Sequence, residues 1–147
     1  MKDPYLKPVV FGGLLITMLS VVFAPAVFLW AAIGGYVAVR IANKITREII
    51  SIPDGLLLGL FSGTIGGTCF DIFTMISLRS PDSQSLLIRI LEKNWPKEAA
   101  PMPDLLNLLP ALLLTTSIFV IIVTVVFAIL GSYIGVLISK QKNKTNN

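Results

Sequence analysis

The chain has 147 residues, of which 54% are hydrophobic and 14% are charged, and its formal net charge is +4. A soluble domain is closer to half apolar and a quarter charged. The apolar residues are concentrated in long uninterrupted runs, as they are in membrane-spanning helices. The composition therefore predicts one all-α domain over residues 1–147 that lies in the lipid bilayer.

The residue types that are absent argue against an enzyme. The sequence has no His and one Cys, Cys69. It therefore lacks the commonest general base and metal ligand, and it has no partner for a disulfide. An intramembrane aspartyl protease would need two buried aspartates, and only Asp71 is a candidate. We expect no catalysis, no cofactor and no metal. The basic residues flank apolar segments, so they predict lipid contact and no nucleic-acid binding.

The first apolar run is too long for one transmembrane helix. It covers residues 8–39, which is 32 residues, whereas a span needs about 20. Pro25 lies in its middle and interrupts a helix. We therefore predict two spans, over about 6–24 and 26–44. The alternative is a signal peptide cleaved near Ala24-Pro25-Ala26, but the segment that follows is itself a span.

The rest of the chain predicts two further spans and one surface helix. Ser51 and Asp54 have the spacing of a capping box and open a helix over about 53–78. Residues 79–104 are polar and form an external loop. Within it, one face of a short amphipathic helix carries Leu87, Ile90, Leu91 and Trp95. The last helix, over about 107–139, is longer than the bilayer requires and should tilt or project.

The charges predict the orientation of this four-helix bundle. The N-terminus, the 40–52 segment and the C-terminus share one side. That side carries Lys2, Lys7, Arg40, Lys44, Arg47, Lys140, Lys142 and Lys144 against Asp3 and Glu48. The other side has four basic and four acidic residues. The positive-inside rule therefore places both termini in the cytoplasm.

Glycine recurs every four residues in the third predicted span, at Gly55, Gly59, Gly63 and Gly67. Lipid provides no hydrophobic drive between helices, so small residues that allow backbones to approach mark a contact face. Two interpretations follow. The stripe packs helices within one chain, or it is also a face that assembles subunits.

Asp71 continues this stripe by one more step of four and is a candidate polar site. A carboxylate inside a membrane is costly and is often functional. Asp71 lies about 25 Å beyond Asp54, close to the outer boundary of the bilayer. There it could have a structural role, paired with Arg79 or hydrated, or it could handle an ion or a proton.

Residues 27–42 and 124–139 form an internal repeat. Five of their sixteen aligned positions are identical, including Gly34 with Gly131. Small residues also align elsewhere, as at Gly135, so these glycines are further candidates for helix packing. Both segments run toward the cytoplasm in the predicted topology. The repeat therefore predicts two parallel-duplicated helical hairpins, with a pseudo-axis along the membrane normal.

The sequence IGGYVAVRIANK, followed by DGLLLGLFSGTIGG, resembles a pattern in small glycine-rich bacterial membrane proteins of unknown function with four helices. In them, a Gly-Gly helix that ends in Arg or Lys precedes a glycine-striped third helix. The resemblance covers roughly residues 30–70. It implies a four-helix topology and the cytoplasmic membrane of a prokaryote, and it implies no activity.

Two functional hypotheses follow. The leading one is an accessory or scaffold protein that packs through its glycine faces and joins itself or a larger membrane complex. The alternative is a small channel or transporter for a neutral or weakly charged solute. In that case Ser and Thr side chains would line a narrow path, with Asp71 as its polar site.

Overall fold

The structure, a computed structural model, describes residues 4–94 and 105–145. These residues form an all-α fold, as the composition predicts. Its elements are α1 (Leu6–Val22), the 3₁₀ helix η1 (Ala24–Ala26), α2 (Val27–Thr46), α3 (Ile52–Ser77), α4 (Pro81–Asn94) and α5 (Leu105–Thr145).

Local sequence signals explain where several of these helices begin and end. Pro25 lies in η1, so the chain reverses between α1 and α2 at the predicted break. The Ser51 hydroxyl caps α3, accepting from the Asp54 N–H at 3.3 Å and donating to the Asp54 carboxylate at 2.6 Å. The last helix extends past the predicted 107–139 to Leu105–Thr145, because no Gly or Pro follows Gly135 to end it.

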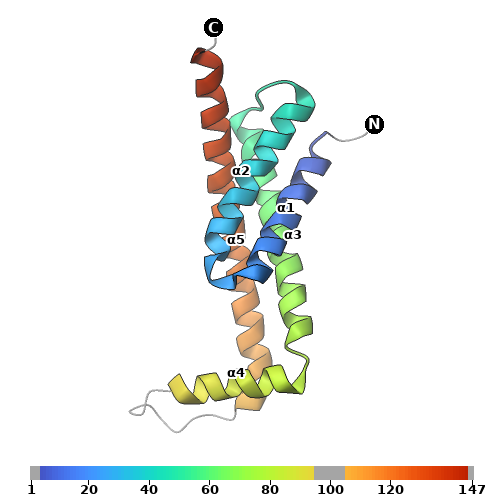
Figure 1. Cartoon of the computed structure of the whole chain (residues 1–147), viewed down its shortest axis with the longest axis vertical. Helices are drawn as coiled ribbons and strands as arrows, with labels where there is room; N and C mark the ends of the chain where they lie inside the picture. Colours follow the sequence, from blue (N-terminus) through green and yellow to red (C-terminus); the bar gives the residue numbers. More distant parts are fainter. Residues whose placement is uncertain (1–3, 95–104, 146–147) are drawn as a thin grey trace.

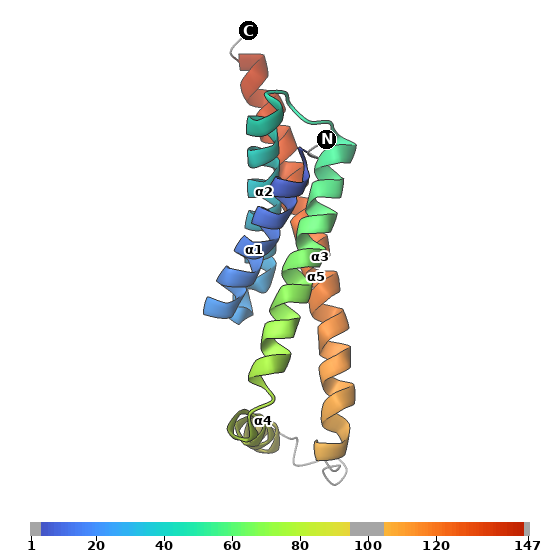
Figure 2. The ribbon, with the colours of Figure 1, turned by 90° about the vertical axis from the view of Figure 1, so that its right-hand side faces the viewer.

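The four longest apolar helices pack side by side. Helices α1 and α3 run away from the end that holds both termini, and α2 and α5 return to it (Figures 1 and 2). Helix α3 packs on α1 and α5, and α2 packs on α1 and α5. Helix α4 lies crosswise at the opposite end of the bundle.

The two halves of the bundle differ in length. With a rise of 1.5 Å per residue, α1 is about 25 Å long and α5 about 60 Å. As a result, α3 and α5 extend well past the turn between α1 and α2 (Figure 2). Toward α4 the bundle therefore consists of two helices instead of four.

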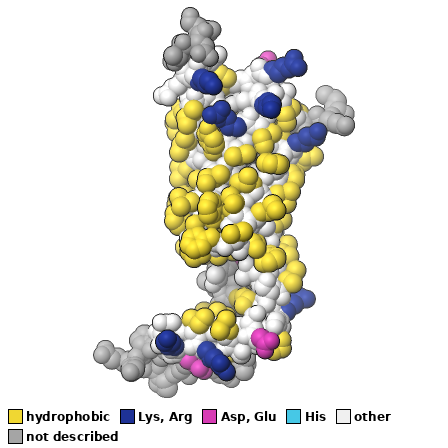
Figure 3. Space-filling view, in the orientation of Figure 1, with side chains coloured by type: hydrophobic (Ala, Val, Ile, Leu, Met, Phe, Trp, Pro, Cys, Tyr) yellow, Lys and Arg dark blue, Asp and Glu magenta, His cyan; other side chains and the backbone are white. Residues whose placement is uncertain are grey.

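A broad apolar surface covers the middle of the molecule, and charged side chains gather at its two ends (Figure 3). Three helical segments of the described chain are long and apolar enough to cross a bilayer: Ala24–Thr46, Ile52–Ser77 and Pro110–Asn143. Helix α1 is also apolar, but its 17 residues fall short of that length. The structure therefore describes a membrane protein with three clear candidate spans, whereas the sequence predicts four.

Asn43 links three segments at the end of the bundle that holds the termini. Its side-chain amide donates to the Ser139 hydroxyl of α5 at 3.0 Å. Its carbonyl accepts from the backbone N–H of Ile50, in the segment between α2 and α3, also at 3.0 Å. Ile50 is buried in the apolar cluster that contains Val39 and Val136. Asn43 therefore holds the α2–α3 connection against α5.

We expect Asn43→Ala to lower the free energy of unfolding by about 1–3 kcal/mol, because it leaves the Ile50 N–H without its partner. Asn94→Ala is the matched control, since Asn94 is exposed on α4. Thermal unfolding in a mild detergent measures both. Equal melting temperatures for the two variants would show that Asn43 does not hold the connection.

Candidate functional site

The glycine stripe of α3 lies against α5. A Cβ atom built on Gly63 would lie 2.7 Å from Val125 Cα and 2.9 Å from the Thr124 carbonyl oxygen. One built on Gly59 would lie 2.7 Å from the Ala128 carbonyl oxygen. Gly55 lies against the side chain of Val136, and Gly67 lies against the side chain of Thr124. Both distances to Gly63 involve the α5 backbone, which cannot rotate away as a side chain can, so only glycine fits there.

A second close contact joins α2 to α5. A Cβ atom on Gly35 would overlap the Ala128 carbonyl, and one on Gly131 would overlap the Ala32 carbonyl. Gly135 lies opposite Val39, where a Cβ atom would approach the Val39 Cβ to 3.2 Å. Gly131 and Gly135, taken from the repeat as packing positions, therefore lie in this interface.

Gly34 serves a different interface from its aligned partner Gly131. It lies against Ile16 and the Gly12 carbonyl of α1. Between α1 and α3, Gly13 lies against Ile65, and Gly66 of α3 lies against Ile16. All eleven glycines of the chain thus lie against another helix of the same chain. The four-residue spacing indicated only the α3 stripe, and the adjacent pairs at 12–13, 34–35 and 66–67 are the signal for the remaining contacts.

Hydroxyl groups reinforce these interfaces. Ser132 of α5 is buried and donates to the Gly35 carbonyl of α2 at 3.0 Å. Thr17 of α1 donates to the Gly66 carbonyl of α3 at 3.2 Å. Ser62, also buried, donates to the Gly59 carbonyl of its own helix. The Ser132 and Thr17 hydroxyls therefore join neighbouring helices through backbone carbonyls, whereas the Ser62 hydroxyl is satisfied within α3.

Asp71 lies in a groove between α3 and α5. The groove is close to the point where these two helices extend past the turn between α1 and α2. The groove has a volume of about 500 Å³ and is lined by Thr68, Asp71, Ile72, Met75, Ile76, Arg79 and Ser117. Asp71 is half-buried, and Ser117 of α5 lines the same groove. Asp71 forms no ion pair with Arg79, although their spacing suggested one. Ser117 is one of the hydroxyl residues that the transport hypothesis places along a path, but its position near Asp71 depends on how α3 packs on α5, which no local pattern predicts.

The surface helix predicted within residues 79–104 corresponds to α4. Leu87 and Leu91 are half-buried, but Ile90, expected on the same face, is 50% exposed. None of the α4 residues is fully buried. Trp95, the last member of the predicted face, lies outside the described residues.

A search for metal ligands and comparisons with known proteins indicate no further site. The described residues contain no group of three or more Cys, Asp or Glu side chains that could hold a metal ion. Comparison with protein-family models, curated proteins and solved structures finds no match for the chain. The resemblance to small bacterial four-helix membrane proteins therefore stays a prediction.

Close packing of α3 on α5 makes Gly63 the most sensitive position of the stripe. We expect Gly63→Leu to destabilise the bundle by more than about 3 kcal/mol, because the new side chain would have to displace the α5 backbone. Thr64→Leu is the matched control, since Thr64 is the exposed neighbour on α3. Yield and melting temperature in detergent should fall for the first variant alone. A Gly63→Leu protein as stable as Thr64→Leu would refute the contact.

Proposed function

We propose that this chain is a small accessory protein of a prokaryotic cytoplasmic membrane, which binds a transmembrane helix of a partner along the groove that contains Asp71. The observation that supports this proposal is the groove itself. It brings Thr68, Asp71 and Ser117 together on apolar helix surfaces. A carboxylate beside lipid is costly, and a polar transmembrane partner would satisfy it.

The packing of the chain favours a partner at this groove over one at the glycine stripe. Every stripe glycine is already in contact with α5, so the stripe has no free surface for a second subunit. By contrast, α3 and α5 extend past α1 and α2 and expose large apolar side chains there, among them Ile76 and Phe119. A partner helix would occupy the space that the short hairpin leaves open.

In this proposal α1 crosses the membrane together with α2, α3 and α5. A helix about 25 Å long approaches the 30 Å of the hydrocarbon core, and local thinning or tilt of neighbouring helices accommodates the remainder. The basic residues at the termini and in the 40–52 segment then face the cytoplasm. Helix α4, with Arg89, Glu92 and Lys93 on its polar side, lies on the outer surface.

A duplicated hairpin is part of the same proposal, in which α1–α2 corresponds to α3–α5. Gly35 and Ser132 are aligned in the repeat, and they contact each other across the α2–α5 interface. The aligned pairs Ala31 with Ala128 and Val39 with Val136 are buried. Gly34 and Gly131, which are aligned but contact different helices, mark where the two hairpins have diverged.

Reporter fusions test the topology. Reporters at the N-terminus, at residue 52 and at the C-terminus should all report the cytoplasm, and a fusion at residue 90 should report the outside. This pattern follows from the eight basic residues on one side. If α1 does not cross, the N-terminus will instead lie on the opposite side from residue 52, and the four-span proposal fails.

Photo-crosslinking in cells tests the partner site. A benzophenone amino acid is placed at Met75, which lines the groove and is 40% exposed, or at Met18 on α1, which is 71% exposed. We expect protein adducts at Met75 and few at Met18, although Met18 is the more exposed. The masses of the adducts tell a second copy of this chain from a different protein. Adducts that are equal at both positions would contradict a specific site.

Substitutions of Asp71 separate partner binding from transport. Asp71→Asn keeps the size and most of the hydrogen bonding, so the Met75 adduct should persist, whereas Asp71→Leu should abolish it. In lipid vesicles that contain the purified protein, we expect no proton or cation flux that depends on Asp71. Flux through the wild-type protein that Asp71→Asn abolishes would overturn the proposal in favour of a transporter.

A further inference from the structure

A second groove lies at the end of the bundle that holds the termini. It is formed between α2 and α5 and has a volume of about 700 Å³. Its lining includes four basic side chains and one acidic one: Arg40, Lys44, Arg47, Lys142 and Glu48. None of these cations forms an ion pair with a carboxylate of the described residues. The groove therefore has an excess of positive charge that the described part of the chain does not neutralise.

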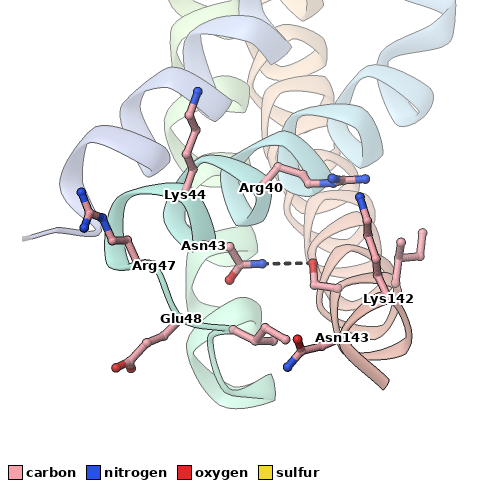
Figure 4. A pocket seen from close by; sticks show the side chains of 10 residues that line it. Arg40, Asn43, Lys44, Arg47, Glu48, Lys142 and Asn143 are labelled. Carbon is pink, nitrogen blue, oxygen red and sulfur yellow. Dashed lines mark hydrogen bonds between the residues drawn. The ribbon is translucent and has the colours of Figure 1, made fainter. Parts of the chain in front are cut away.

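Two of the cations come from different helices and converge. The side chains of Arg40 on α2 and Lys142 on α5 point toward one another, whereas Lys44, Arg47 and Glu48 point away from this pair (Figure 4). The Asn43–Ser139 hydrogen bond fixes α2 against α5 beside them. Like charges repel, so their convergence on a fixed scaffold is favourable when an anion lies between them.

Contacts with Tyr36 hold the guanidinium of Arg40 in one orientation. Its Nε atom donates to the Tyr36 hydroxyl at 2.8 Å, and its Cζ atom lies 5.3 Å from the centre of the Tyr36 ring. The terminal N–H groups of a guanidinium form a planar fork that matches two phosphate oxygens. The Tyr36 ring itself lies against Gly135 of α5, where a Cβ atom would approach it to 3.3 Å. The small residue at position 135 therefore leaves space for the Tyr36 ring in the position where it contacts Arg40.

We propose that this groove binds the phosphate of an anionic phospholipid head group, through Arg40 and Lys142. The groove lies where the apolar surface of the molecule meets its basic end. Its lining also includes Ile49 and Ile138, and Ile138 is 39% exposed. Apolar side chains beside the cations suit a phosphate that is attached to glycerol and acyl chains better than a free anion in water. The site is independent of the partner groove at Asp71.

Native mass spectrometry of the full chain in mild detergent tests this site, with phosphatidylglycerol or phosphatidylcholine added at equal concentration. We expect the wild-type protein to retain phosphatidylglycerol about 25-fold more strongly, because each basic side chain at an anionic head group contributes about a factor of five. The double variant Arg40→Gln, Lys142→Gln should lose this preference. The matched control Arg89→Gln, Lys93→Gln removes two positive charges from the exposed α4 at the other end of the molecule, and this variant should keep the preference.

Three outcomes would overturn the inference. The wild-type protein binds the two lipids equally, the control loses as much preference as the double variant, or glycerol phosphate displaces the lipid at equal concentration. The last result would identify a soluble anion as the ligand. If the double variant does not fold, Tyr36→Phe serves in its place, because it keeps both charges and removes the oxygen that orients Arg40. Its preference should fall several-fold, and an unchanged preference would also overturn the inference.

Discussion

The fold depends on the close approach of helix backbones across glycine. Lipid tails are as apolar as the surface of a helix, so the hydrophobic effect does not drive helices together inside a bilayer. Their association must come from tight packing and hydrogen bonds. Gly59 and Gly63 allow α3 to touch the α5 backbone, and Gly35 and Gly131 allow α2 to do the same. Once the backbones are this close, the Ser132 hydroxyl can reach a carbonyl on the neighbouring helix.

This constraint also determines what remains for function. The glycines lie in contacts within the chain, and the buried hydroxyls of Ser62, Thr124 and Ser132 bond to backbone carbonyls, so the interior of the four-helix part serves packing. Two surfaces at opposite ends of the bundle remain. One is the groove around Asp71, where α3 and α5 extend beyond the α1–α2 hairpin. The other is the basic groove between α2 and α5, at the end of the bundle that holds the termini. The two proposed sites, one for a partner helix and one for a lipid, fit an accessory role better than a pore.

Local signals in the sequence were sufficient for the helices and for the main contact face. Long apolar runs, the break at Pro25 and the cap at Ser51 located most helix ends within a few residues. The regular spacing from Gly55 to Gly67 marked one face of a single helix, which is a local property. The length of α5 was underestimated, because a polar tail without Gly or Pro gives no sign of whether a helix continues through it.

Properties that depend on two helices at once could not be predicted in this way. Gly34 contacts α1, whereas its aligned partner Gly131 contacts α2. This difference depends on how the helices cross. The same is true of Asp71 and Ser117, which line one groove, and of Arg40 and Lys142, whose side chains point toward one another. Each pair is distant in the sequence, and neither member carries a motif. The register of α5 against α2 and α3 brings them together, and no local pattern encodes that register.

The central claim is that the α3 stripe packs on α5 of the same chain. A cysteine pair at Gly67 and Thr124, in a Cys69→Ser background, tests it most directly. A Cβ atom on Gly67 would lie 3.4 Å from the Thr124 Cβ, which is close to the separation in a disulfide. On mild oxidation the account predicts a disulfide within one chain, seen as a monomer on a non-reducing gel and mapped by mass spectrometry. A disulfide-linked dimer joined through these two positions would contradict it.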